Sequence, residues 1–245
     1  MALQLVQVDI KAGDDASLGR FWAAALGWGV SSEGPGVTNV EPVGFDWPDP
    51  SAVCVDVVTV PDPETVRYRV HLDLATTSAA HHAALVTRLQ ELGATPAGPA
   101  PGGPPRTVLA DPEGNLFCVL EPRATDRDTG PIAEVVLDCA DPPALTRFWE
   151  AAIGWTVHAV SDDHALLRSA EGVGPYLRLL REPHLPNPWS RVHLDLRPRP
   201  GDDQAAEVAR LEELGAALAA GGRTGHPWRV MTDPGGQEFC VLAPA

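Results

Sequence analysis

The sequence predicts an α+β protein built from two tandem copies of one unit. The segment RVHLDL at residues 69–74 recurs residue for residue at 191–196, a displacement of 122 residues (191 − 69). Strand-like and helix-like patterns follow each other in the same order in both copies, which favours helices segregated to one face of mixed or antiparallel sheets. We therefore expect one domain at residues 1–122 and another at 131–245, joined by a polar linker at 123–130.

The first part of each unit reads as a strand, a helix and further strands. Residues 3–10 alternate apolar and polar side chains, which predicts a strand. A stripe from Leu18 to Leu26 has helical spacing, and Gly27 ends it. Residues 30–50 are rich in Gly and Pro and predict short strands or a long loop, and the run at 52–60 predicts a further strand.

The second part of each unit repeats this order. RVHLDL is a strand, and residues 78–92 form a helix that a glycine ends. The turn sequence at 111–115 separates strands at 107–110 and 116–120. Each half of the chain therefore consists of two similar modules.

The composition restricts the class of partner. There are 33 acidic residues against 18 basic ones, giving a net charge of −15. This charge disfavours nucleic acid and anionic membranes as partners and is compatible with a cationic ligand. Lys11 is the only lysine, and so strong a bias towards arginine is typical of a GC-rich genome such as that of an actinobacterium.

The localisation is expected to be cytoplasmic. There is no leader-like start and no apolar run long enough for a bilayer. The four cysteines form no CxxC pair and are expected to be reduced thiols. The pattern leaves the choice between monomer and homodimer open.

The repeated strand carries the candidate catalytic groups. Because strand side chains alternate, His71 and Asp73 share one face, as do His193 and Asp195. Each pair is either a hydrogen-bonded structural histidine or a cavity-lining group. A histidine oriented by a carboxylate can also act as a general base. All four residues are candidates for catalysis.

Three motifs together resemble one superfamily. The patterns RFW…ALGW at 20–28, RVHLDL, and DPEGNLFCVL at 111–120 resemble the vicinal oxygen chelate superfamily, also called glyoxalase/bleomycin-resistance/dioxygenase. Within it, the chain is similar to tandem glyoxalase-like proteins. The resemblance covers both halves and implies paired βαβββ modules that form a half-open barrel around a ligand cavity. It also implies that metal ligands, where present, come from the first and last strands of each module.

The resemblance also allows the ligand positions to be compared. The superfamily's last ligand is normally a glutamate seven residues after the Asp of the turn, but here these positions are Cys118 and Cys240. Gln7 stands at the first ligand position of the first half, and Val136 is aligned with it in the second half. The fourth strand offers Cys54 or Asp56 in the first half, against Tyr176 and Arg178 in the second.

A metal site is therefore expected, if anywhere, in the first domain. Gln7, Asp56, His71 and Cys118 would be its ligands, a mixed set suited to zinc. Val136 and Arg178 disfavour a cation in the second domain. Because the usual carboxylate is absent from both halves, the main expectation is that the protein uses no metal.

The function that the sequence favours is metal-free binding of a small organic molecule, aromatic or cationic, for sequestration, resistance or secondary metabolism. Aromatic residues in Pro-rich loops suit a planar ligand. The alternative is a metal-dependent lyase, isomerase or dioxygenase with its site in the first domain. The residues expected to line ligand cavities are His71, Cys118, Trp47, His193, Glu238, Cys240, Trp228 and Tyr176.

Overall fold

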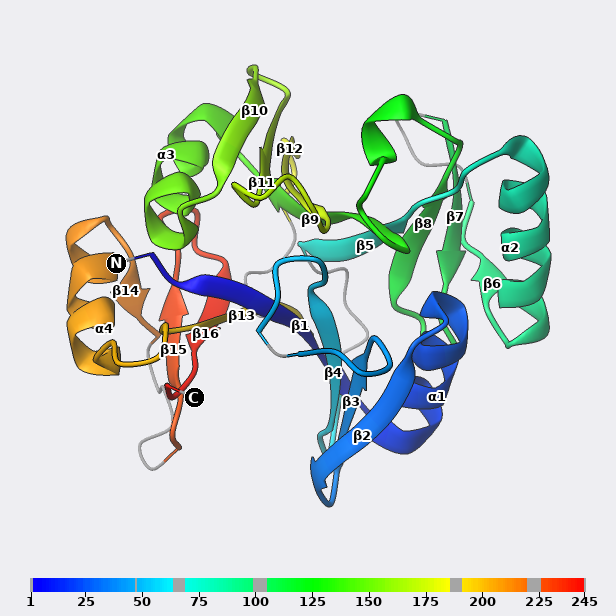
Figure 1. Cartoon of the computed structure of the whole chain (residues 1–245), viewed down its shortest axis with the longest axis horizontal. Helices are drawn as coiled ribbons and strands as arrows, with labels where there is room; N and C mark the ends of the chain where they lie inside the picture. Colours follow the sequence, from blue (N-terminus) through cyan, green and yellow to red (C-terminus); the bar gives the residue numbers. More distant parts are fainter. Residues whose placement is uncertain are drawn as a thin grey trace.

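The chain forms four βαβββ modules that together make two sheets (Figure 1). The computed structural model describes residues 2–46, 48–63, 69–98, 105–185, 191–219 and 226–244. The first module contains β1 (Gln4–Ala12), α1 (Asp15–Leu26), β2 (Gly29–Gly34), β3 (Val37–Glu41) and β4 (Cys54–Thr59). The second contains β5 (Val70–Leu74), α2 (Ala79–Glu91), β6 (Thr95–Pro96), β7 (Arg106–Ala110) and β8 (Leu116–Leu120).

The second half repeats this order after a short 3-10 helix, η1 (Ala124–Asp126). The third module contains β9 (Ile132–Cys139), α3 (Pro142–Ile153), β10 (Thr156–Val160), β11 (His164–Arg168) and β12 (Tyr176–Arg181). The fourth contains β13 (Val192–Arg197), α4 (Gln204–Glu213), β14 (Ala217–Leu218), β15 (Arg229–Thr232) and β16 (Glu238–Val241). The predicted α+β class is confirmed, and the predicted stretch 30–50 contains two short strands.

Each sheet takes one module from each half of the chain. Sheet A has the order β14-β15-β16-β13-β1-β4-β3-β2, and sheet B has β10-β11-β12-β9-β5-β8-β7-β6. At the centre of sheet A, β1 pairs antiparallel with β13. At the centre of sheet B, β5 pairs antiparallel with β9. The four central strands therefore join the two repeats, and neither sheet closes into a barrel.

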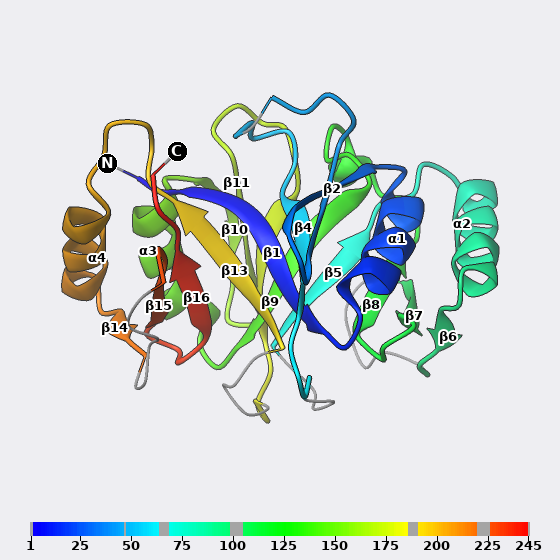
Figure 2. The ribbon, with the colours of Figure 1, turned by 90° about the horizontal axis from the view of Figure 1, so that it is seen from below.

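The helices and their aromatic residues hold together the two modules of the same half of the chain. Figures 1 and 2 show α1 and α2 at one end of the molecule and α3 and α4 at the other. In the first half, the ring centroids of Trp22 and Phe117 lie 5.2 Å apart. In the second half, those of Trp149 and Phe239 lie 5.5 Å apart. These aromatic contacts hold modules of the same half together, whereas the sheets hold modules of different halves together.

Local sequence explains where the first helix of each half begins and ends. Asp14 caps α1 by accepting a hydrogen bond from the Ser17 N–H, and Gly27 ends the helix at a φ of 70°. In α3, Asp141 accepts from the Ala144 N–H and Gly154 ends the helix at a φ of 69°. Among the described helices, none combines the length and apolar character needed to cross a bilayer.

Candidate functional site

Two similar polar clusters lie on the sheets, one on each, and each is built from both repeats. In sheet A, Gln7 of β1 is opposite Asp195 of β13, and Asp9 is opposite His193. On the other side of β1, Asp9 is in register with Asp56 of β4. These side chains share one face of the sheet, because the alternate residues of β1 and β13 belong to the apolar core.

In the sheet A cluster, a histidine, a carboxylate and a thiol converge. His193 Nε2 lies 3.2 Å from Asp195 Oδ1 and 3.4 Å from Cys240 Sγ. The candidate ligand atoms of these three residues all lie within 4.8 Å of one another. Two further groups adjoin them, since Gln7 Nε2 donates to Asp56 Oδ2 at 2.6 Å and to Asp195 Oδ2 at 3.1 Å. Asn39 Nδ2 donates to Asp56 Oδ1 at 3.1 Å.

The sheet A cluster holds more carboxylates than positively charged groups. Burial raises the pKa of Asp9 to about 6, although His193 opposes the rise. For His193, burial disfavours the charged ring, but Cys240, Asp9 and Asp195 together raise its pKa well above its usual value. Burial also raises the pKa of the Cys240 thiol. Sheet A therefore places several carboxylates around one histidine, an arrangement that attracts a cation.

The sheet B cluster has the same histidine, aspartate and cysteine as the sheet A cluster, but the strands that face them carry different residues. His71 Nδ1 lies 3.0 Å from Asp73 Oδ1, and their ligand atoms lie within 4.8 Å of that of Cys118. The neighbouring strands, however, present arginine. Arg178 stands opposite Val136 of β9, whereas Asp56 stands opposite Asp9 in sheet A.

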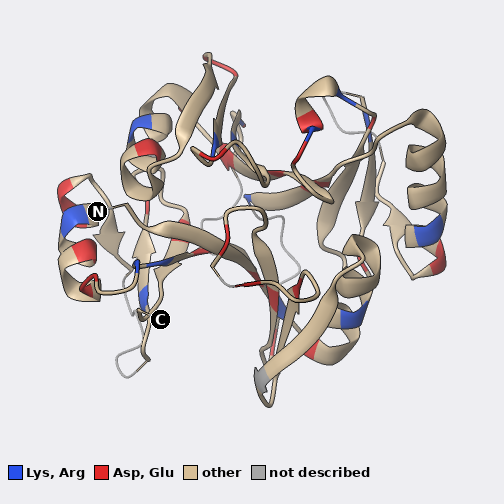
Figure 3. Cartoon of the chain, in the orientation of Figure 1, with Lys and Arg blue, Asp and Glu red and all other residues tan. Residues whose placement is uncertain are grey.

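A glutamate held by two arginines completes the sheet B cluster. Glu134 Oε1 lies 2.9 Å from Arg123 Nη2 and 3.4 Å from Arg178 Nη1. For Asp73, burial opposes ionisation, but the charge and hydrogen bond of His71 outweigh it and hold the pKa below its usual value. Positive charge therefore stands in sheet B where sheet A has a carboxylate. Figure 3 colours the acidic and basic residues along both sheets.

The four residues that the sequence favoured as metal ligands lie on two different sheets in the structure. Gln7 and Asp56 belong to sheet A, whereas His71 and Cys118 belong to sheet B. Each half therefore does not assemble its own ligand set. Instead, Gln7 and Asp56 lie on the same sheet as His193, and Arg178 lies across β9 from His71, with Val136 between them.

The sequence alignment also placed Val136 two residues away from the true counterpart of Gln7. Gln7 faces Asp195 in sheet A, and Glu134 faces Asp73 in the same way in sheet B. Trp22 and Trp149 are 127 residues apart (149 − 22), as are Gln7 and Glu134 (134 − 7), whereas the later motifs are 122 residues apart. The spacing of the two tryptophans therefore indicates Glu134 as the counterpart of Gln7. The sequence analysis did not include Asp9, Glu134 or Arg123 among the site residues, and it did not pair Arg178 with Glu134.

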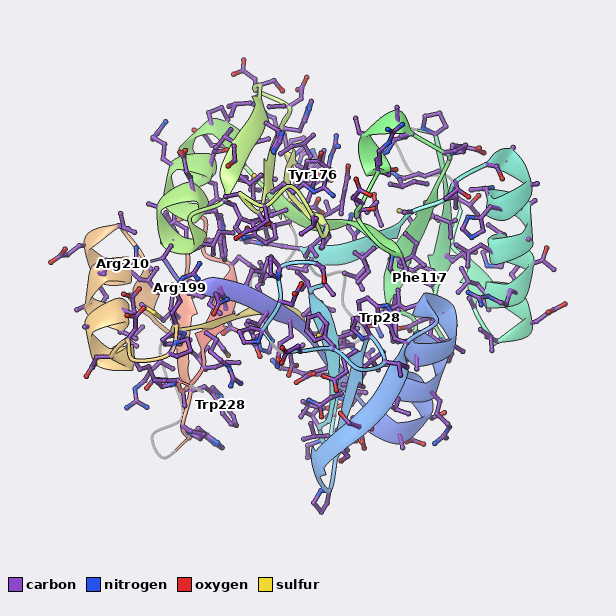
Figure 4. The ribbon with its side chains drawn as sticks, in the orientation of Figure 1. Trp28, Phe117, Tyr176, Arg199, Arg210 and Trp228 are labelled. Carbon is purple, nitrogen blue, oxygen red and sulfur yellow. The ribbon has the colours of Figure 1, made fainter. Side chains whose placement is uncertain are left out.

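The aromatic candidates lie in different surroundings. Tyr176 belongs to β12, with Arg168 Cζ 4.8 Å from its ring centroid and the His158 ring at its edge. Trp228 stacks on His226 at 4.5 Å between centroids, and Figure 4 shows it at the edge of the molecule, away from Tyr176. Trp47 lies outside the described residues.

Glu238 is the remaining ligand-lining candidate. It begins β16 and lies two residues before Cys240, hence on the same face of sheet A. It is half-buried, and the cross-strand neighbour of its backbone is Thr232.

Comparison with known proteins identifies the class. A family model described as "Glyoxalase-like domain" matches residues 6–120 and 134–242. The chain therefore belongs to the glyoxalase-like domain family, within the vicinal oxygen chelate superfamily, as the sequence motifs predicted. No curated protein matches the chain.

Solved structures agree at the level of the fold. Glyoxalase I from Zea mays is 16% identical, with a TM-score of 0.66 over 99% of this chain and 92% of that chain. A variant of the same maize enzyme is 18% identical, with a TM-score of 0.68 over the same shares. A putative dioxygenase from Bacillus subtilis is 13% identical, with a TM-score of 0.60 over 98% of this chain and 86% of that chain.

Proposed function

We propose that the sheet A cluster binds one divalent metal ion and that the protein is a metal-dependent lyase, isomerase or dioxygenase acting on a small organic molecule. The carrying observation is the convergence of His193, Asp195 and Cys240, whose ligand atoms lie within 4.8 Å of one another. The proposal keeps the chemistry of the alternative expected from sequence but moves its site from one repeat to a sheet that both repeats share.

The donor set fits a metal of intermediate softness. Imidazole, carboxylate and thiolate together suit zinc and similar ions. Asp56 and Gln7 adjoin the three central ligands and would supply further oxygen atoms. Asp195 Oδ1 is buried with His193 Nε2 3.2 Å away, and a cation held by both residues would satisfy this oxygen.

Asp9 would position the histidine. Its Oδ1 lies 3.8 Å from His193 Nδ1, on the side of the ring away from Cys240. A carboxylate behind a ligating histidine fixes the ring's orientation and raises its basicity, leaving Nε2 for the metal. When bound, a divalent metal supplies Lewis acidity that polarises a carbonyl or lowers the pKa of a hydroxyl.

Metal content measured on the purified and zinc-reloaded protein tests this proposal. We expect one equivalent per chain in the native protein, and loss of metal in His193→Asn and Cys240→Ala. His71→Asn and Cys118→Ala are the matched controls in sheet B and should keep the metal, because Arg178 occupies the place of Asp56 there. Cobalt substitution gives a second readout, since a thiolate ligand produces a charge-transfer band that Cys240→Ala removes.

Circular dichroism of each variant separates loss of a ligand from loss of the fold. Absence of metal uptake by the correctly folded native protein would overturn the proposal. Equal metal retention by His193→Asn and His71→Asn would also do so, since the site would then lie elsewhere.

A second candidate function is metal-free binding of a cationic organic molecule by the same face, for sequestration or resistance. The specific observation that favours it is Gln7, whose amide nitrogen already donates to Asp56 and Asp195 and so compensates both carboxylates without a metal. The metal measurement separates the two candidates: a folded protein without metal that retains an organic cation in native mass spectrometry supports the second.

A further inference from the structure

A cavity of about 260 Å³ lies apart from both polar clusters. It opens between the start of β1, the end of α3, the loop around residues 48–52, the segment 169–171 and Arg199 beyond β13. None of His193, Asp195, Cys240, Gln7 and Asp56 lines it. Figure 4 shows Arg199 beside the beginning of β1. The cavity is therefore a second, separate candidate site.

The inner surface of the cavity is apolar and fixed. It is lined by the buried side chains of Leu3, Leu5, Ile153 and Trp155. The Leu3 N–H donates to the Ala152 carbonyl oxygen at 2.9 Å, which ties the start of β1 to the end of α3. Because both elements are held in this way, the apolar floor is preformed and does not have to assemble around a ligand.

Tight backbone contact fixes the other wall. A Cβ added at Gly174 would lie 2.0 Å from the Pro50 carbonyl oxygen, so the loop around Pro50 packs directly against the β11–β12 connection. Arg168 stabilises that connection by donating to the Gly174 carbonyl oxygen at 2.9 Å and to that of Arg127 at 3.0 Å.

One acceptor at the cavity lacks a donor. Gln4 Oε1 is buried and receives no hydrogen bond from any described residue. A buried acceptor without a partner is costly, and a ligand that brings an N–H or O–H donor would remove this cost.

The rim carries charges of both signs. Asp49 and Glu171 are acidic, and Arg199 is basic; all three are exposed and line the cavity. Ser169 Oγ donates to Glu171 Oε2 at 2.9 Å and holds that carboxylate in place. Within the described part of the chain, neither Glu171 nor Arg199 forms an ion pair, so both charges remain available to a ligand.

From these features we infer that this cavity binds a small zwitterion of the α-amino acid type with an apolar side chain. The ammonium group would donate to Gln4 Oε1 and the acidic rim, and the carboxylate would pair with Arg199. The side chain would lie against Leu5, Ile153 and Trp155. The volume is below that of a drug-sized site, about 300 Å³ or more, and therefore suits a molecule of this size.

Calorimetric titration with three matched probes tests the inference. L-phenylalanine carries both charges, phenethylamine lacks the carboxylate, and 3-phenylpropionate lacks the ammonium group. We expect L-phenylalanine to bind with a dissociation constant of about 1 mM. Each of the other probes should bind at least about tenfold more weakly, because each leaves one charge of the site unpaired.

Variants locate the binding. Arg199→Gln should weaken L-phenylalanine about tenfold, and Ala170→Trp, at the exposed rim, should abolish binding by filling the cavity. Arg147→Gln, an exposed arginine on α3, is the matched control and should bind as the native protein does. His193→Asn should also bind normally, because His193 does not line the cavity.

Three results would overturn the inference, each in proteins whose circular dichroism matches the native spectrum. They are the absence of saturable L-phenylalanine binding, equal affinity for the three probes, and binding that survives Ala170→Trp. Loss of L-phenylalanine binding in His193→Asn would place the ligand on sheet A instead.

Discussion

At the residue scale, the two turns that follow β7 and β15 show how one side chain changes the hydrogen bonding of a buried carboxylate. Asp111 accepts hydrogen bonds from Trp22 Nε1 and from Asn115 Nδ2 on the same oxygen, at 3.2 and 2.7 Å. Asp233 accepts the equivalent bond from Trp149 Nε1 at 3.2 Å. In its turn, however, the amide of Gln237 is directed to the Glu238 carbonyl oxygen.

The missing donor matters because Asp233 is almost fully buried. Burial raises the pKa of Asp233 to about 6, and the backbone N–H of Gln237 and the indole of Trp149 lower it only in part. A carboxyl whose pKa is raised on folding binds its proton more tightly in the native state. Its contribution to stability is therefore complete below about pH 4 and is lost as the pH rises to about 6.

Gln237→Asn should give Asp233 the donor that Asp111 already has. We expect the free energy of unfolding at pH 7 to rise by about 1 kcal/mol, because a charged acceptor gains a buried hydrogen bond. Urea unfolding at pH 7 and at pH 4 measures this. The gain should shrink at pH 4, where the carboxyl is protonated in the native state, and an equal gain at both values would contradict the explanation.

The residue scale also marks the limit of sequence reasoning about the site. Alternation along the strands correctly indicated that His71 and Asp73 share a face, because that follows from local geometry alone. Which residues stand opposite them depends on strand pairing between distant segments, and no local pattern fixes that choice. Arg178 was consequently assigned to the site of the second half, although it lies across β9 from His71, and Glu134 was not considered.

At the element scale, close packing of α1 on β3 requires a glycine within the helix. Gly19 lies in the middle of α1, where glycine costs helix stability relative to alanine. A Cβ at this position would lie 2.3 Å from Thr38 Cγ2 of β3. Thr38 in turn donates to Asp15 Oδ2 at 2.7 Å and so anchors the first turn of the helix.

Gly19→Ala should therefore destabilise the protein, by about 1–3 kcal/mol, despite the better helix propensity of alanine. Thr38→Ser in the same chain removes the nearest clashing atom and keeps the hydroxyl that Asp15 accepts from, so it should restore part of the loss; the Thr38 Cβ, 2.9 Å from the added Cβ, remains. Thermal unfolding of the two single variants and the double variant measures the coupling. Additive effects would show that the close contact is not the cause.

The element scale is where sequence reasoning was most successful. The helical stripe from Leu18 to Leu26, its glycine end and the strand from Leu116 to Leu120 are all confirmed. Each depends on periodicity and capping within a short stretch, and these signals are local. Residues 123–130 hold more structure than a plain linker, since Arg123 binds both Asp126 and Glu134.

At the scale of the whole molecule, the two repeats cannot be separated without cutting both sheets. β1 needs β13 as its neighbour, and β5 needs β9. The buried Arg191 crosses the same boundary, because its Nε donates to the Lys11 carbonyl oxygen at 2.7 Å and its Nη2 pairs with Glu113. The division at residues 1–122 and 131–245 is therefore a proposal about the repeats in the sequence. In the structure, each repeat needs strands of the other to complete its sheets.

Separate expression of the two repeats tests this dependence. We expect residues 1–122 alone to self-associate or to remain largely unfolded, because β1 and β5 would each expose an unpaired edge. Co-expression with residues 131–245 should give a one-to-one complex with the circular dichroism spectrum of the intact chain. Analytical ultracentrifugation distinguishes the outcomes, and two stable monomeric repeats would contradict the expectation.

Because every site draws on both repeats, each sheet combines a constant side with a variable one. His71, Asp73 and Cys118 on one sheet have the same identities as His193, Asp195 and Cys240 on the other. The facing strands differ completely, with Gln7, Asp9 and Asp56 in sheet A against Glu134, Val136 and Arg178 in sheet B. The chain thus places one set of three polar side chains in two different electrostatic surroundings, and each sheet serves as the internal reference for the other.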